Sequence, residues 1–319
     1  MKHIFVVNPK AGPTNSVAFI RQEVEKLRPR YDCEVYETTG VGDATDFVRR
    51  YLESNPNLSV RFYACGGDGT LNEVMTGALG HAGASISCYP CGSGNDFVKY
   101  YGGADRFMDF EALLNGKERG IDILTDGERY SINVANFGFD YAVAKKMSEV
   151  KNKLFFKGKT AYTFGVVHSL FHAMKSKAKV FVDGKRFGKE DALLLCTVSN
   201  GSFVGGSYNC APLSDNEDGL LEICLVKPIS VFRLLRLIGV YKKGQHLNNP
   251  KFADILYYVR GKEVEVFAEE DSFGYTMDGE LVTAKHVVFR ILPEAIRFAV
   301  PLSKEEAAAE ADAEQAVLP

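Results

Sequence analysis

From residue 1 to about residue 124, short apolar runs alternate with segments whose apolar residues recur at helical spacing. Short apolar runs are typical of buried strands, and the wider spacing is typical of amphipathic helices. The pattern predicts strands at residues 3–7, 33–37, 60–65 and 85–89, and helices at residues 16–27, 44–53 and 71–79. Such alternation implies βαβ units, so we expect an α/β domain with a doubly wound, mostly parallel sheet.

After about residue 125 the pattern changes to short alternating runs separated by turn pairs such as Asp183-Gly184. This change predicts a second, largely antiparallel and β-rich domain. Its expected strands are 130–137, 178–182, 192–198, 220–225, 255–258, 263–267 and 286–291, and its expected helices are 141–149, 160–174 and 231–241. Proteins of this layout often bind ligands in the cleft between domains, where we expect the active site.

Length and composition agree with two domains. A chain of 319 residues exceeds the usual size of one domain, and 46% hydrophobic with 25% charged residues is ordinary for a globular protein.

The net charge of -3 argues against a dedicated nucleic-acid binder. Seven scattered cysteines favour a reducing cytoplasm, and no apolar stretch reaches the length of a membrane span, so we expect any membrane contact to be peripheral.

The apolar run at 60–65 ends in Gly66-Gly67-Asp68-Gly69-Thr70-Leu71-Asn72, which predicts a strand followed by a tight turn and a helix. Glycines there let the backbone N–H groups approach a phosphate without an intervening side chain. We expect Thr70 to cap a helix that begins at Leu71, with the positive end of that helix at the same place. A carboxylate such as Asp68 repels a phosphate unless a cation or proton lies between them, which favours Mg-nucleotide chemistry.

Three other special loops also follow predicted strands. They are Asn8-Pro9-Lys10-Ala11-Gly12, Thr38-Thr39-Gly40 and Gly92-Ser93-Gly94-Asn95-Asp96-Phe97. With the Gly66 loop they should lie along the carboxyl edge of one parallel sheet, where ligands of such folds bind. The chain contains neither a P-loop nor a GxGxxG fingerprint, so classical NAD binding is not favoured.

Two acidic loops in the second half are further candidates. Asp215-Asn216-Glu217-Asp218-Gly219-Leu220 could hold a hard cation with carboxylate and carbonyl oxygens, although an acidic surface turn is the alternative. Met277-Asp278-Gly279-Glu280 carries two acids, and a tight Asp-Gly hairpin is the alternative there. If this turn faces Asp68, one of its acids could take a proton from a substrate hydroxyl.

The four loops from Asn8, Gly66, Gly92 and Asp215, followed by Asp278-Gly279-Glu280, occur in an order that resembles the diacylglycerol kinase catalytic-domain superfamily, over about residues 2–303. The chain looks like the soluble bacterial lipid kinases of that group, whose fold is related to NAD kinases and phosphofructokinases. The resemblance implies ATP contacts for Asn8, Gly12, Thr39, Gly66, Gly67, Asp68, Gly69, Thr70, Leu71, Asn72 and Ser93. It implies a structural Mg²⁺ on Asp215, Asp218 and the Leu220 carbonyl, and a proton acceptor in Glu280, with Asp278 as second candidate.

The resemblance also implies domain roles and an activity. Residues 1–124 would be the nucleotide-binding domain, which 293–303 could complete, residues 125–292 the lipid-substrate domain, and 304–319 a flexible acidic tail. The activity would be ATP- and Mg²⁺-dependent phosphorylation of a lipid hydroxyl, with diacylglycerol as the leading candidate and Asp68 organising the catalytic metal. The alternatives are a kinase of NAD or another soluble alcohol, and a nucleotide sensor without turnover.

Partners are less defined by the sequence. Six lysines from Lys145 to Lys159 could dock the protein on the anionic inner face of the membrane, or could form a solvated surface. They are Lys145, Lys146, Lys151, Lys153, Lys157 and Lys159. An exposed strand edge in the second domain could pair with a second copy of the chain, so a homodimer is a further expectation.

The motif Cys88-Tyr89-Pro90-Cys91 is interpreted as packing at a strand end. A minor hypothesis is that its oxidation disturbs the ATP pocket.

Overall fold

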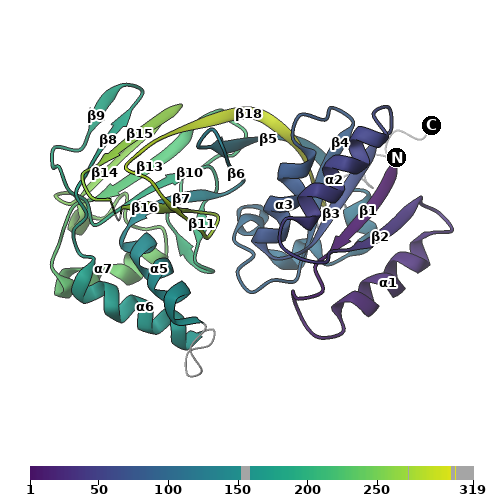
Figure 1. The fold of residues 1–319 in the computed structure, drawn as a ribbon, viewed down its shortest axis with the longest axis horizontal. Helices are drawn as coiled ribbons and strands as arrows, with labels where there is room; N and C mark the ends of the chain where they lie inside the picture. Colours follow the sequence, from purple (N-terminus) through teal and green to yellow (C-terminus); the bar gives the residue numbers. More distant parts are fainter. Residues whose placement is uncertain (152–158, 272, 303–305, 307–319) are drawn as a thin grey trace. The chain divides into compact units, whose positions relative to one another are not determined.

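The computed structural model describes residues 1–151, 159–271, 273–302 and 306 (Figure 1). The chain folds as two compact units, the first beginning with Met1–Ile121 and resuming at Glu294, the second being Asp122–Pro293. The segment predicted as a flexible tail, 304–319, lies outside the described residues apart from Glu306. Among the described residues, no helix is both long enough and apolar enough to cross a bilayer.

The first unit follows the predicted alternation of strands and helices. Its elements are β1 (Lys2–Val7), α1 (Ser16–Leu27), β2 (Cys33–Glu37), α2 (Asp43–Ser54), β3 (Val60–Gly66), α3 (Asp68–Ala78), β4 (Ala84–Pro90), the 3-10 helices η1 (Phe97–Tyr101) and η2 (Ala104–Phe107), α4 (Phe110–Leu114) and the start of β5 (Lys117–Thr125). The strand order is β2-β1-β3-β4, extended by the last part of β18 (His286–Val300), and these neighbours pair in parallel.

Burial explains why these strands are nearly continuous apolar runs. All seven residues of β3 and of β4 are buried, as expected for parallel strands that are covered on both faces. Helix α2 packs against α3, while α1 packs against α4. The strand order turns away in opposite directions from β1, toward β2 on one side and toward β3 on the other. The ends of β1 and β3 therefore form a topological switch point, where ligands of open α/β sheets bind.

The second unit is β-rich, as predicted. It contains β6 (Tyr130–Ser131), β7 (Val134–Gly138), α5 (Phe139–Lys151), α6 (Lys159–His172), β8 (Ala178–Val182), β9 (Lys185–Phe187), β10 (Leu195–Ser199), β11 (Phe203–Val204), β12 (Tyr208–Asn209), β13 (Leu221–Val226), α7 (Val231–Lys242), η3 (Pro250–Phe252), β14 (Leu256–Gly261), β15 (Glu263–Ala268), β16 (Gly274–Met277), β17 (Glu280–Thr283) and the first part of β18. One sheet has the antiparallel order β14-β13-β10-β7-β16-β17, and β9-β8-β15-β18 pair antiparallel beside one another.

Two apolar clusters hold this unit together. Alternate residues of β13 enter different clusters: Leu221, Ile223 and Leu225 pack with β8, β15 and β18, whereas Cys224 and Val226 pack with α5 and α7. Figure 1 shows α5, α6 and α7 gathered on one side of the strands of this unit. Because β13 is buried on both faces, its sequence is a continuous apolar run except at Glu222.

Several predicted boundaries are wrong for local reasons. The strand expected at 130–137 is split into β6 and β7, because the backbone N–H groups of Ile132 and Val134 donate to the Asp278 carboxylate instead of continuing a ladder. The strand expected at 286–291 continues to Val300, passing from the second unit into the first at Glu294, where φ is +47°. Strands β16 and β17 were not predicted, since each is only four residues long.

Candidate active site

Glycines allow two loops of the first unit to touch. A Cβ atom on Gly92 would lie 2.4 Å from the Cα of Gly67, so a larger residue at position 92 would push the loops apart. The N–H groups of Cys91 and Gly92 both donate to the Gly66 carbonyl, at 2.9 and 3.2 Å. The loops after β3 and β4 are thereby joined into one backbone surface at the N-terminus of α3. Backbone N–H groups and a helix N-terminus together make an anion site.

Thr70 does not cap a helix that begins at Leu71, as the sequence had suggested. Helix α3 begins three residues earlier, at Asp68, and its N-cap residue is Gly67, which makes no side-chain capping hydrogen bond. Thr70 instead lies inside the first turn, where its Oγ1 accepts a hydrogen bond of 3.1 Å from Nδ2 of Asn8. A Cβ atom on Gly66 would come within 2.2 Å of this same Oγ1. Gly66 is therefore required so that Thr70 can connect α3 to the loop after β1.

We expect Gly66→Ala to destabilise the protein by about 1–3 kcal/mol, because the methyl group must displace Thr70 from a packed position. Gly69→Ala is the matched control, since a Cβ atom there meets nothing within 4 Å and alanine is the better helix former. The measurement is chemical or thermal unfolding of both variants. Equal stabilities of the two variants would contradict this account of the loop.

The Asp68 carboxylate is fixed by the loop after β4. Its Oδ1 accepts the backbone N–H of Asp96 at 2.7 Å and that of Phe97 at 3.3 Å. Burial, together with the nearby charge of Asp96, raises the pKa of Asp68 despite these two hydrogen bonds. Asp96 in turn lies 2.5 Å from Nζ of Lys99. A carboxylate held rigidly beside a turn and a helix N-terminus that could bind an anion is suited to organise a cation or its waters.

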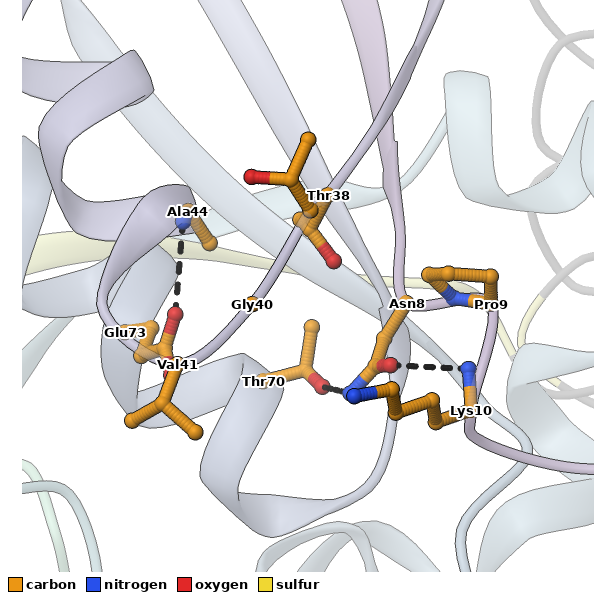
Figure 2. Close-up of a pocket in the computed structure, with 10 residues that line it drawn as sticks. Asn8, Pro9, Lys10, Thr38, Gly40, Val41, Ala44, Thr70 and Glu73 are labelled. Atoms are coloured by element: carbon orange, nitrogen blue, oxygen red, sulfur yellow. Dashed lines mark hydrogen bonds between the residues drawn. The ribbon is translucent and has the colours of Figure 1, made fainter.

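A pocket opens between the loops after β1 and β2 and the first turns of α2 and α3 (Figure 2). Its lining consists of Asn8, Pro9, Lys10, Thr38, Thr39, Gly40, Val41, Ala44, Thr70 and Glu73. The structure thus brings the predicted ATP contacts Asn8, Thr39 and Thr70 together, although they are far apart in the sequence. Oδ1 of Asn8 also accepts the N–H of Lys10 at 3.0 Å, which folds the first loop over the pocket.

The remaining predicted ATP contacts lie outside this pocket's lining, on the turn between β3 and α3 or in neighbouring loops. They are Gly12, Gly66, Gly67, Asp68, Gly69, Leu71, Asn72 and Ser93. Ser93 is exposed, Leu71 is buried, and Oδ1 of Asn72 is buried without a hydrogen-bond partner among the described residues. An unpaired buried acceptor of this kind needs water or a ligand donor. That requirement is consistent with a polar molecule beside α3.

Glu73 was not predicted as a site residue. Its Oε2 accepts the N–H of Ala44 at 3.3 Å, and its carbonyl accepts the hydroxyl of Thr45 at 2.9 Å, so Glu73 fixes the start of α2 at the pocket. Helical periodicity could have found it, because position 73 lies one turn after Thr70 on the same face of α3. Thr39 is similarly fixed, since its N–H donates to Oδ2 of Asp43 at 2.7 Å.

In the second unit, Asp278-Gly279 forms the tight hairpin that the sequence left as an alternative. Met277 pairs with Glu280 across β16 and β17, and both turn residues have positive φ, +46° and +89°. Oδ1 of Asp278 accepts the N–H of Val134 at 3.0 Å, and Oδ2 accepts that of Ile132 at 3.1 Å. Glu280 is exposed. The two acids therefore differ: Asp278 fixes the turn, and Glu280 presents its carboxylate to solvent.

The 215–220 loop is tied down by a buried carboxylate, Asp122, which the sequence did not reveal. Oδ2 of Asp122 accepts the N–H of Gly219 at 2.6 Å, and the N–H of Asp122 donates to the Asn216 carbonyl at 2.7 Å. Oδ1 of Asp215 accepts the N–H of Glu217. No group of three or more His, Cys, Asp or Glu side chains that could hold a metal occurs among the described residues.

The predicted metal ligands nevertheless have the right chemistry. Asp215, Asp218 and the Leu220 carbonyl offer only oxygen atoms, which suit a hard cation such as Mg²⁺. Oδ1 of Asp218 accepts the N–H of Leu220 at 3.0 Å, and its Oδ2 is hydrogen-bonded to the guanidinium of Arg260. The donor set therefore fits the ion, but one carboxylate is shared with a positively charged side chain.

Burial raises the thiol pKa of both Cys88 and Cys91, so these thiols stay protonated, as expected for packing residues.

Of the six lysines considered for membrane docking, Lys146 is paired with Glu149 at 2.9 Å, and Lys145 lies over the ring of Tyr141. Lys153, Lys157 and the side chains of Lys151 and Lys159 lie outside the described residues.

Comparison with known proteins places these sites in a family. Residues 2–125 match the family model of the diacylglycerol kinase catalytic domain, and residues 133–300 match that of the YegS C-terminal NAD kinase beta sandwich-like domain. The second match alone covers more than half of the chain. The Gly66–Thr70 turn and the pocket beside it lie in the first matched region, and the 215–220 loop and the Asp278-Gly279 turn lie in the second.

Individual relatives agree over nearly the whole chain. A "Diacylglycerol kinase" of Bacillus subtilis is 27% identical over 304 residues, covering 91% of this chain and 95% of that protein. A "Probable lipid kinase YegS-like" of Chromohalobacter salexigens is 28% identical over 298 residues, covering 91% of each. A crystal structure of a putative diacylglycerol kinase from Bacillus anthracis has the same fold, with a TM-score of 0.73 over 94% of this chain and 96% of that one, at 22% identity. The chain is a kinase that belongs to the diacylglycerol kinase family, in the group whose second domain is of the YegS type.

Proposed function

We propose that the protein is an ATP- and Mg²⁺-dependent lipid kinase that transfers the γ-phosphoryl group to a lipid hydroxyl, with diacylglycerol as the first candidate acceptor and phosphatidic acid as the product. The observation that carries the proposal is the cradle at the switch point between β1 and β3, where Asp68 is held beside an N–H-lined turn at the start of α3. Mg²⁺, when bound with the nucleotide, supplies neutralisation of phosphate charge. The names of the relatives support a lipid acceptor.

In this proposal the residues of the chain divide the work. The backbone of the Gly66–Thr70 turn binds phosphate oxygens, the pocket beside Thr39 and Glu73 holds the nucleoside, and Asp68 orients the charged end of the nucleotide. Glu280 accepts the proton of the acceptor hydroxyl while the new O–P bond forms and the bond between the β- and γ-phosphates breaks. ADP and the lipid phosphate are the products.

A peripheral contact with an anionic membrane belongs to the proposal. Helix α7 contains the exposed cations Arg236 and Lys242 but no acidic residue, and it exposes Phe232 to 83% and Leu235 to 56%. An exposed apolar face flanked by cations has the chemistry of a surface that binds anionic lipid head groups and inserts apolar side chains between them. Lys145 on α5 adds positive charge to the same unit.

The test is transfer of labelled γ-phosphate from ATP with Mg²⁺ into a mixed lipid extract on vesicles, with NAD as a soluble acceptor in a parallel reaction. We expect label in a product that migrates as phosphatidic acid, and more of it from anionic than from neutral vesicles. Label in NADP with none in lipid would establish the soluble-alcohol alternative. Absence of label in both, from a protein that binds ATP, would favour a nucleotide sensor.

A further inference from the structure

Arg260 on β14 connects the 215–220 loop to the strand that follows it. Its guanidinium Nη2 donates to Oδ2 of Asp218, and its Nε lies 2.6 Å from Oε1 of Glu222. Glu222 on β13 is directly opposite Arg260 in the register of the two strands. The Glu222 side chain is only 1% exposed, so its carboxylate needs a positive partner, and Arg260 provides that charge.

Arg260 thereby occupies part of a predicted metal ligand. One oxygen of Asp218 accepts the N–H of Leu220, and the other accepts the guanidinium. Asp215 contributes a second carboxylate on the same short loop, and Asp122 fixes the loop backbone through Gly219. A divalent cation bound through Asp218 must therefore sit next to an existing positive charge on a loop that has little freedom to move away.

We propose that Arg260 is a positioning residue that sets the divalent-cation affinity of the 215–220 loop, because it holds the Asp218 carboxylate and opposes a second positive charge beside it. The inference rests on the proposed function only for the identity of the ion, Mg²⁺. Repulsion between a divalent and a monovalent cation a few ångströms apart is large even at the effective dielectric of a protein surface. Removing the charge of Arg260 should therefore strengthen ion binding by at least about tenfold.

Glu222 gives the proposal a second consequence of opposite sign. In the wild-type protein the charge of Arg260 is divided between Glu222 and Asp218. When Glu222 is neutral, the guanidinium interacts with Asp218 alone, and one negative charge near the loop is lost. Both effects weaken binding of a divalent cation. Glu222→Gln should therefore weaken Mg²⁺ binding, whereas the double variant Glu222→Gln with Arg260→Gln should strengthen it without leaving a buried unpaired charge.

The experiment is calorimetric titration of Mg²⁺ into the nucleotide-free full-length chain, with a thermal melt of each variant to establish folding. Asp215→Asn identifies the heat that belongs to the loop, because it removes one ligand charge and should abolish that signal. We expect the double variant to bind Mg²⁺ at least about tenfold more tightly than wild type, and Glu222→Gln to bind several-fold more weakly. Arg260→Lys, which keeps the charge, should stay near wild type.

Unchanged or weaker binding by a folded double variant would overturn the proposal, and so would absence of loop binding in every protein. Binding by the double variant but not by wild type would support it, since Arg260 would then exclude the ion. If the double variant does not fold, the single Glu222→Gln change decides the matter, and unchanged or tighter binding there would overturn the proposal. The titration needs no turnover, so its result is separate from whether the lipid assay succeeds.

Discussion

Replacing Asp68 by asparagine is expected to lower phosphoryl transfer by on the order of a thousandfold while the fold stays intact. Asparagine keeps Oδ1, which accepts the N–H groups of Asp96 and Phe97, so the loop after β4 retains its anchor. What is lost is the negative charge that is proposed to orient the metal-bound end of the nucleotide. Asp68→Ala should lose activity to the same extent, but it also removes the two hydrogen bonds.

The measurement is initial-rate transfer of labelled phosphate into lipid, beside the exposed control Asp46→Asn on α2. The control should keep wild-type turnover. If a folded Asp68→Asn protein were as active as the control, the proposed role of Asp68 would be wrong.

Stability gives an independent check that the Asp68 variant is folded. Burial and Asp96 raise the pKa of Asp68 in the folded state, so the ionised carboxylate opposes folding at pH values above its folded pKa. Below the ordinary value of 3.8 the group is protonated in both states, and the penalty disappears. Asp68→Asn should therefore melt at a higher temperature than wild type at neutral pH, and this difference should shrink as the pH falls toward 3.8.

The second large effect separates the two acids of the β16–β17 turn. Glu280→Gln is expected to lower turnover by about 10²–10⁴-fold with no loss of stability, because its side chain is exposed and is proposed as the proton acceptor. Asp278→Asn should instead destabilise the protein by about 1–3 kcal/mol. Each oxygen of Asp278 accepts a separate backbone N–H, and an amide can replace only one of the two acceptors.

Both variants are compared by lipid phosphorylation rate and by unfolding. Thr283→Val on the same hairpin is a control for the loss of a hydrogen bond away from the acids, since Thr283 pairs with Gly274 and its hydroxyl lies 3.3 Å from that of Tyr141. A stable Asp278→Asn protein with no activity, beside a fully active Glu280→Gln protein, would assign the proton acceptor to Asp278 instead.

Much of the fold was accessible from the sequence, because buried parallel strands and amphipathic helices have distinct patterns. The predictions for α1 and β2 match the structure to the residue, and those for β1, β3 and β4 are within one residue at each end. The antiparallel second unit was also predicted correctly. Its short strands β16 and β17 were not predicted. Each has only four residues beside the Asp278-Gly279 turn, which is too short for an alternating pattern to be distinguished from a turn.

The site was less accessible, because its missing parts depend on distant contacts. The sequence marked the Gly66–Thr70 turn, but it could not show that Thr70 hydrogen-bonds Asn8 instead of capping a helix. Asp122 is a single acidic residue inside the apolar end of β5, and nothing in the sequence pattern shows that it fixes the 215–220 loop. Arg260 likewise resembles a surface cation of an edge strand. Its contact with Asp218 appears only when the strands are paired, because the register then places Arg260 opposite Glu222 and within reach of the 215–220 loop.

The path of β18 has a consequence for how the protein is made. Its last part supplies the strand next to β4, where Arg297 pairs with Ser85, and Phe298 is fully buried against Phe97 and Tyr101. During synthesis these residues follow the whole second unit, which at about 5–20 residues per second delays them by roughly ten seconds or more. Until then β4 is paired with β3 on one side only, and its other edge is open; unpaired strand edges promote association. Of the two units, the one that begins at Met1 is thus translated first and completed last.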